Sequence, residues 1–432
     1  MIYEDGSPTR CARDEPDEAA RRSVAGTKQQ KRSALARELL VSVLVIAVGA
    51  FTVVGMSANA PLFRQHFGLS ETGVGAIAST GYLGAMATAR VGGTITDRRG
   101  PKIVIVAGLL VLALGAVTAS AAFVVGLFYL GVLICGFGYG AINPATTVMA
   151  NPSSSRRRGL TLSLKQSGVP VGGMLAGVLL PSVGAAAGWR VSLLVPVSMA
   201  LAVLVVVLWL HKQESMPMTR MATVPSSNVT LRLPIGYGYG MIMGGTQVTI
   251  FAFTAVYLVE ARGLSPSMSG LLLALLFVGG ITGRLAWGWL SDVRDEDRIR
   301  LLQLVAFLGA VLLGALTMIP NGAVPAVLFL IGVCSVGWNG VYIAAVAEAA
   351  VAEAAMAEDT LPERVGAASG ASLVLINLGA VVLPVVVGIL IESLGGWRAG
   401  WFACAGLSLV GAGVATASRR GTAKGSTMQV LS

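Results

Sequence analysis

Charge is scarce in this sequence. Only 12% of its 432 residues are Asp, Glu, Lys or Arg, whereas 55% are hydrophobic. This balance is far from the composition of soluble globular domains. The chain is therefore expected to be an integral membrane protein that works in a lipid bilayer.

Histidine and cysteine are also rare, and neither is arranged for chemistry. The two histidines, His66 and His211, flank apolar segments and do not pair within one. The cysteines show no paired spacing of the metal or disulfide kind, and no nucleophile or cofactor motif appears, which argues against a membrane enzyme. One cysteine lies in the polar N-terminal segment and three lie in apolar runs, where buried, inert side chains are expected: Cys11, then Cys135, Cys334 and Cys404.

Acidic residues are the scarcer charged class, with 21 Asp and Glu against 31 Lys and Arg and a formal net charge of +10. The basic residues occupy alternate loops and form no patch interleaved with aromatic residues, which argues against a nucleic-acid partner. Loops rich in Lys and Arg are typical of the cytosolic side of a membrane protein. Both termini are therefore expected in the cytosol, and the Ala, Gly and Val bias suits a bacterial inner membrane.

Long apolar runs are abundant. About 20 apolar residues cross a bilayer as a helix, and continuous runs such as 103–115 exclude the alternating pattern of a barrel. The runs predict an all-α membrane protein with twelve transmembrane helices in two six-helix halves. The expected parts are a disordered cytosolic tail (1–38), an N-terminal six-helix bundle (39–211), a cytosolic linker (212–233), a C-terminal six-helix bundle (234–417) and a second cytosolic tail (418–432).

An internal repeat supports the division into two halves. Gly68-Leu69-Ser70 returns as Gly263-Leu264-Ser265, and Asp97 returns as Asp292, each 195 residues later (292 − 97 = 195). A duplicated helical membrane protein is most often a transporter, because two equivalent halves can rock about a site held between them. The repeat therefore predicts transport.

One loop carries a family signature. The segment Gly93-Thr94-Ile95-Thr96-Asp97-Arg98-Arg99-Gly100-Pro101-Lys102 fits Gly-x-x-x-Asp-Arg-x-Gly-x-Lys, which lies between spans two and three of the major facilitator superfamily. With the duplication and the number of spans, the chain resembles this superfamily over nearly its whole length beyond the tail. The resemblance implies paired halves and a loop that clamps the outward-open state from the cytosolic side.

The clamp residues follow from that resemblance. In the first copy they are Gly93, Asp97, Arg98, Gly100 and Lys102, and in the second copy they are Gly288, Asp292 and Arg294. Gly93 is expected to let a neighbouring helix come close. Asp295 stands where Gly100 stood, so the second copy is expected to clamp more weakly. The alternative is that these charges only set the topology.

Three basic side chains lie inside predicted spans, namely Arg284, Lys165 and Arg90. Such groups cost several kcal/mol in an apolar helix unless they meet a partner or a wet cavity. No Asp or Glu lies at the centre of a predicted span, so an anionic substrate is favoured as the missing countercharge. The planar fork of Arg284 is the first candidate for a carboxylate ligand, Lys165 the second and Arg90 the third. The alternatives are snorkelling to the cytosolic surface or pairing with Asp292 or Asp97.

A short stretch adds a closer resemblance. Arg284-Leu285-Ala286-Trp287-Gly288 is similar to the Arg-x-x-x-Gly stretch in span eight of monocarboxylate and oxalate/formate carriers, which implies that Arg284 binds the substrate carboxylate. Two features depart from those carriers. Gly280 stands where monocarboxylate carriers have a proton-linked Asp, and residues 371–384 contain no Lys like that of the oxalate carriers. A proton carrier is therefore not evident.

Polar and aromatic residues near the middle of the spans are expected to complete the site by hydrogen bonds. For each of them the alternative is packing between helices. They are Asn59, Tyr139, Asn143, Gln247, Trp338, Asn339 and Tyr342.

The sequence thus predicts a monomeric secondary transporter without a cofactor. It is expected to move a small organic anion, a carboxylate, by alternating access with proton symport or exchange. The rival is multidrug or metabolite efflux by proton antiport. The drug/proton antiporter signatures are Gly-Pro-x-x-Gly-Gly in span five and an Arg in span four. This chain has Val169-Pro170-Val171-Gly172-Gly173 and no basic residue over 132–140, so both signatures fail.

Overall fold

The described residues of the computed structural model are 15–150, 164–210, 238–293, 297–346, 348 and 361–430. They form helices joined by short turns, and strands are absent from these ranges. The first group of helices, called the N-terminal group, comprises α1 (Glu15–Ala58), α2 (Ala60–Phe67), α3 (Glu71–Arg99), α4 (Pro101–Ser120), α5 (Val125–Met149), α7 (Gly168–Ala187), α8 (Trp189–Ser192) and α9 (Leu194–Leu210).

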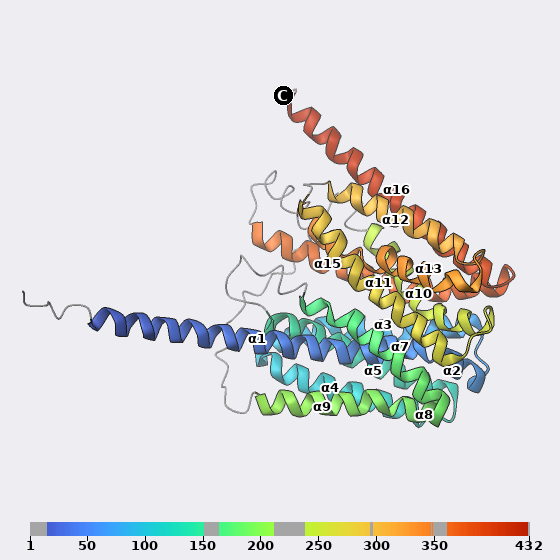
Figure 1. Cartoon of the computed structure of the whole chain (residues 1–432), viewed down its shortest axis with the longest axis horizontal. Coiled ribbons are helices and arrows are strands. Elements are labelled where there is room, and N and C mark those ends of the chain that lie inside the picture. The colour runs from blue at the N-terminus through green and yellow to red at the C-terminus, as the bar shows by residue number, and fades with distance from the viewer. Residues whose placement is uncertain are drawn as a thin grey trace, which may run out of the picture.

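The second group, called the C-terminal group, follows residue 238. Figure 1 shows it lying above the N-terminal group, with the free ends of α1 and α16 projecting beyond the other helices. Its elements are α10 (Gly240–Glu260), α11 (Pro266–Val293), α12 (Arg298–Ala315), the 3-10 turn η3 (Asn321–Ala323), α13 (Val324–Ile331), the π-helix η4 (Gly332–Val336), α15 (Leu361–Ser393) and α16 (Trp397–Val430).

Eleven helical segments in the described ranges are long and apolar enough to cross a membrane. They include 24 residues of α1 from Leu35 to Ala58 with a mean hydropathy of 2.6, and the segment Asn321–Val346, which spans α13 and η4. The long helix α3 is not one of the eleven. The prediction of an all-α membrane protein is confirmed.

Local sequence sets the helix ends. The Ser70 hydroxyl caps α3 by accepting a hydrogen bond from the Gly73 amide at 3.2 Å, as expected of a serine N-cap. Gly100 joins α3 to α4 with φ at +85°, a conformation that L side chains avoid. Pro101 then opens α4, where its missing N–H costs nothing. The predicted signature loop is therefore a tight helical hairpin.

Two helix pairs hold the groups together. The α3–α15 pair is so close that a Cβ on Gly75 would lie 2.3 Å from the Pro384 carbonyl oxygen. The α7–α11 pair is equally close, because a Cβ on Gly270 would lie 2.3 Å from the Gly177 carbonyl oxygen. Small residues permit such contacts between helices in a membrane. Gly75 and Gly270 occupy the same place in the repeat (270 − 75 = 195).

The chain ends differ from the prediction. Helix α1 begins at Glu15, so residues 15–38 are helical although a disordered tail was expected. Helix α16 continues to Val430, well past the expected end of the last span at 417. The predicted linker 212–233 lies outside the described residues.

Candidate functional site

Arg284 lies at the boundary between the two groups. It belongs to α11, and its Nη1 donates a hydrogen bond of 3.0 Å to the Gln166 carbonyl oxygen, in the helical turn before α7. Its Nε is buried without a hydrogen-bond partner in the described part of the chain. Tyr139 of α5 lies close enough to interact electrostatically with the guanidinium. Arg284 therefore faces the N-terminal group with unused donor capacity.

Lys165 is the other buried cation, and only 1% of it is exposed. Its Nζ contacts three oxygens: Asn143 Oδ1 at 2.7 Å, Thr147 Oγ1 at 2.9 Å and the Asn143 carbonyl at 3.1 Å. An ammonium has three donors, so this cradle satisfies each of them. All three acceptors are neutral, and the positive charge keeps no countercharge there.

Neither cation is neutralised by an acid in the described ranges. The ion pairs found there involve Arg64, Arg298 and Arg419, not Arg284 or Lys165. The alternative, a pairing of these cations with Asp97, is not seen, because Asp97 is exposed and unpaired among the described residues. The Asp292 side chain lies outside the described part. The structure thus brings the two predicted cations to adjoining turns, because Arg284 bonds to the carbonyl of Gln166 and Lys165 is the residue before Gln166.

The Lys165 cradle yields a stability prediction. Asn143→Leu removes the closest acceptor and is expected to destabilise the protein by about 2 kcal/mol, because a buried charged donor then lacks a partner. Lys165→Met removes the charge itself and is expected to be neutral or stabilising. Thermal unfolding of the single variants and of the double variant Lys165→Met/Asn143→Leu measures this. The double variant should be more stable than Asn143→Leu alone; equal destabilisation in both would contradict the cradle.

A second polar cluster lies in the C-terminal group. Gln247 Oε1 of α10 accepts hydrogen bonds from Trp338 Nε1 and from Asn339 Nδ2, both at 3.0 Å. The Asn339 amide also points at the Val336 carbonyl, 3.4 Å away at the end of η4. Gln247 and Asn339 are partly exposed. The structure thus joins two of the predicted polar residues in one network.

Two predicted substrate contacts are buried instead. Trp338 and Tyr342 are both 0% exposed and pack with Tyr239, ring centroids 5.7 and 5.8 Å apart. Trp338 supports the network through its hydrogen bond to Gln247, and Tyr342 packs against Trp338. Their burial corresponds to the alternative that the sequence left open for them, packing between helices.

Three further predicted residues have other surroundings: Asn59 and Arg90 lie apart from the two cations, whereas Tyr139 lies near Arg284. Asn59 is buried in the turn between α1 and α2 and donates to Ser192 Oγ at 2.6 Å, so it pins a break in the helix and does not line a cavity. Tyr139 is 7% exposed and packs against Gly49 of α1. Arg90 is exposed on α3 and makes no side-chain contact with Lys165 or Arg284 in the described ranges.

The predicted clamp is described only in part. Asp97 and Arg98 are exposed at the end of α3, and Lys102 is partly exposed with an interaction of its own. The expected close approach at Gly93 is wrong, because a Cβ there would meet Pro144 at an ordinary 3.8 Å.

The neighbouring glycine makes the close contact instead. A Cβ on Gly92 would lie 2.7 Å from the Ala141 Cα. In the second copy, Gly288 has open space around it. Arg294 and the Asp292 side chain lie outside the described residues.

The opposite end of the bundle carries an ion-pair cluster that the sequence did not reveal. Arg64 of α2 contacts Glu71 of its own group through Nη2 at 2.7 Å and Glu260 of the C-terminal group through Nε at 2.7 Å. Glu392 of α15 also accepts from the Thr72 amide at 2.6 Å. These bonds close the two groups at the end opposite Asp97. The sequence held a signal for this ion pair. Arg64 and Glu260 follow the first predicted span of each half, and their separation (260 − 64 = 196) differs by one residue from the repeat spacing of 195.

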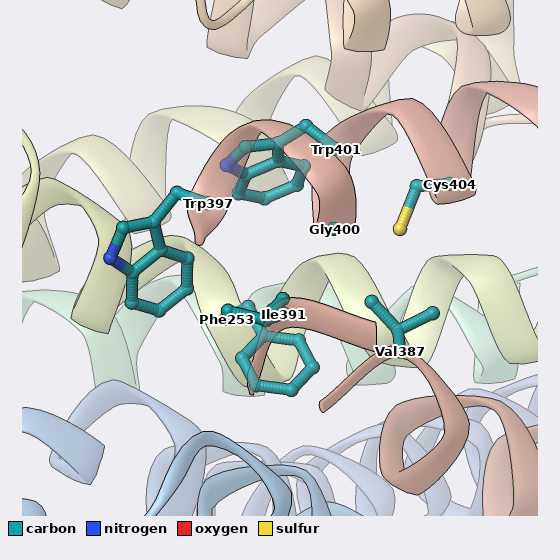
Figure 2. A pocket seen from close by; sticks show the side chains of 7 residues that line it. All are labelled: Phe253, Val387, Ile391, Trp397, Gly400, Trp401 and Cys404. Atoms are coloured by element: carbon teal, nitrogen blue, oxygen red, sulfur yellow. The ribbon is translucent and has the colours of Figure 1, made fainter. Parts of the chain in front are cut away.

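A small apolar pocket lies among α10, α15 and α16 (Figure 2). Its walls are aromatic and aliphatic, with Trp397 at one side of the view, Cys404 at the other, and Phe253 and Trp401 between them. No charged or amide side chain lines it. It therefore lacks the groups that recognise an ion, and it shares no residue with the predicted site.

The major facilitator superfamily model matches residues 40–357. The chain belongs to this superfamily. Superfamily members are transporters, and the expectation that the protein is not an enzyme is confirmed by the relatives it matches.

Three known proteins illustrate the likeness. A hexuronate transporter of Bacillus subtilis (strain 168) is 24% identical, over 82% of this chain and 87% of its own. Monocarboxylate transporter 11 of Homo sapiens is 26% identical, over 85% of this chain and 81% of its own. A crystal structure of a bacterial homologue of the human lysosomal transporter Spinster has a TM-score of 0.71 at 14% identity, covering 89% of this chain and 97% of that chain. The similarity to monocarboxylate carriers is thereby confirmed.

Proposed function

We propose that this transporter moves a small organic anion, a carboxylate, by alternating access with proton symport or exchange. One observation carries the proposal: Arg284 and Lys165 lie at adjoining turns of the two groups without an acid on either among the described residues. Buried charge is expensive unless it is paired. A carboxylate supplies the missing countercharge.

The two cations take different roles in this proposal. Arg284 has a planar fork and unused donors, which suit the two oxygens of a carboxylate. Lys165 keeps its donors on the cradle and contributes its field. Because Lys165 donates to Asn143 Oδ1, the amide nitrogen of Asn143 is available as a further donor. This nitrogen has no partner in the described chain and is not buried.

The relatives support the same substrate class. Hexuronate and monocarboxylate, the names that the two relatives carry, denote carboxylates. Because Arg284 bonds to the Gln166 carbonyl across the boundary between the groups, a carboxylate held on its unused donors lies at that boundary. Substrate binding at this boundary is therefore coupled to the relative position of the two helix groups, as alternating access requires.

The architecture belongs to the proposal as well. We place α3 as the twelfth span, so that residues 39–211 and 234–417 form two six-helix halves of a monomer. Both termini face the cytosol, in a bacterial inner membrane. Asp97 and Arg98 then belong to the cytosolic clamp, together with Gly100, Lys102 and the second copy at Gly288, Asp292 and Arg294, while the Arg64 cluster closes the outer side.

A thermal-shift screen of the purified full-length protein tests the substrate class. Carboxylates at about 100 times their dissociation constant should stabilise the folded protein by about 2.7 kcal/mol, because ligands that bind only the folded state shift unfolding. Matched amides and amines of the same size serve as controls. Stabilisation by neutral and cationic compounds equal to that by carboxylates would contradict the proposal and favour drug efflux.

A further inference from the structure

The orientation of the Gln247 amide is fixed by its neighbours. An indole N–H can only donate, so the side of the amide that faces Trp338 Nε1 must be the oxygen. The same oxygen accepts from Asn339 Nδ2. The nitrogen of Gln247 therefore points away from Trp338.

The orientation of Asn339 is fixed in the same way. Its Nδ2 faces two acceptors, Gln247 Oε1 at 3.0 Å and the Val336 carbonyl at 3.4 Å. Its oxygen must then point the other way. The hydrogen bonds run from the buried indole through Gln247 to Asn339. Both amides are oriented because the indole N–H can only donate and the Val336 carbonyl can only accept.

Two polar atoms are left over by this network. Gln247 Nε2 and Asn339 Oδ1 have no hydrogen-bond partner within the described residues, and neither is a buried unpartnered atom. One is a donor and the other is an acceptor. A hydroxyl group both donates and accepts, so it matches this pair, whereas a methyl group or a hydrogen leaves both atoms unpaired.

The segments that carry the amide pair and Arg284 pack together. Helix α11 and the segment after η4 touch backbone to backbone, since a Cβ on Gly337 would lie 2.8 Å from the Gly283 Cα. Arg284 follows Gly283 by one residue, and Asn339 follows Gly337 by two. Helix α11, which carries Arg284, therefore packs against the segment that carries Asn339, and α10, which carries Gln247, contacts both α11 and η4.

We propose that Gln247 and Asn339, oriented by the buried Trp338 indole, bind a hydroxyl group of the substrate, so that the cargo is a hydroxylated organic acid. This inference rests on the proposed function, with the carboxylate on Arg284. Trp338 is a positioning residue that does not touch the cargo. Sites built to hydrogen-bond a hydroxyl discriminate strongly against analogues that lack it, because their own polar groups are then left unpaired.

Matched acids test the inference on the purified full-length protein. The probes are three pairs that differ in hydroxyl groups: lactate and propionate, 4-hydroxybenzoate and benzoate, gluconate and hexanoate. The dissociation constant of each is measured by thermal shift. At least one pair should favour the hydroxylated acid by about tenfold or more, as expected for a buried hydrogen-bonded hydroxyl.

Variants show whether the amide pair causes the preference. Asn339→Leu and Trp338→Phe should each reduce the ratio of the two dissociation constants to about twofold or less, while the acid without the hydroxyl still binds. Trp401→Phe is the matched control, because the Trp401 indole N–H is buried without a partner among the described residues. It should keep the wild-type ratio.

The outcomes separate the two proposals. Equal affinity for both members of every pair, with carboxylate binding intact, overturns the hydroxyl inference and leaves the carboxylate proposal standing. A preference that survives in Asn339→Leu also overturns the role of the amides. If none of the six acids binds, the proposed function itself fails and the inference fails with it.

Discussion

Replacing Arg284 with alanine is expected to weaken carboxylate binding by about 2 to 5 kcal/mol, the usual loss when one partner of a buried charge pair is removed. At 1.4 kcal/mol per tenfold, this is about 30-fold or more in the dissociation constant. The physical reason is that Arg284 keeps an unused donor at the boundary between the groups and has no acid partner among the described residues, whereas the Lys165 donors are occupied by Asn143 and Thr147. Binding by thermal shift and uptake into proteoliposomes both measure the loss.

Two further variants make the Arg284 result specific. Arg284→Lys keeps the charge without the planar fork and should recover only part of the affinity. Arg398→Ala removes a positive charge that is exposed in the first turn of α16 and should bind as the wild type does. Unchanged carboxylate affinity in Arg284→Ala would remove this residue from the site, whatever the other variants do.

Gly75→Leu is expected to reduce transport by about 5- to 150-fold while substrate binding persists. A Cβ at this position would lie 2.3 Å from the Pro384 carbonyl oxygen, so a side chain there forces α3 away from α15. Overpacking of this kind costs about 1 to 3 kcal/mol. A free-energy change of this size shifts the equilibrium constant between two conformational states by about 5- to 150-fold. The state in which the groups meet near Glu71 becomes the less populated one.

Transport and hydrogen exchange check the Gly75 prediction. Uptake into proteoliposomes gives the rate, and faster amide exchange over residues 71–75 reports the loss of contact at this end. Gly406→Leu is the control, because a Cβ on Gly406 meets open space. Wild-type uptake by Gly75→Leu would show that this contact does not form part of the transport cycle.

The sequence predicted the site's charges but not their surroundings. Lys165 and Arg284 stood out because a cation within an apolar run needs an explanation. That Thr147 and the Gln166 carbonyl contact them depends on how α5, α7 and α11 pack, which no local pattern encodes. The lack of Asp and Glu in the middle of the predicted spans is a property of the sequence itself, and the Asp292 side chain lies outside the described residues.

The errors came from side-chain direction. Gly92 and Gly93 are neighbours in sequence but face different ways on α3, and only packing shows that Gly92 meets Ala141. Asn59 was taken for a cavity residue because an apolar run hides the turn between α1 and α2. Trp338 is buried against Tyr239, and this depends on tertiary packing that the local sequence does not encode.

The acid-free surroundings of Lys165 and Arg284 also bear on energy supply. Fixed positive charge attracts an anion into the bilayer but does no work in moving it against a voltage. Entry of one negative charge into a cell with an inside-negative potential costs about 2.3 kcal/mol per 100 mV. A monovalent cargo taken up with one proton moves without net charge and avoids that cost, whereas exchange against another monoanion does so without any proton.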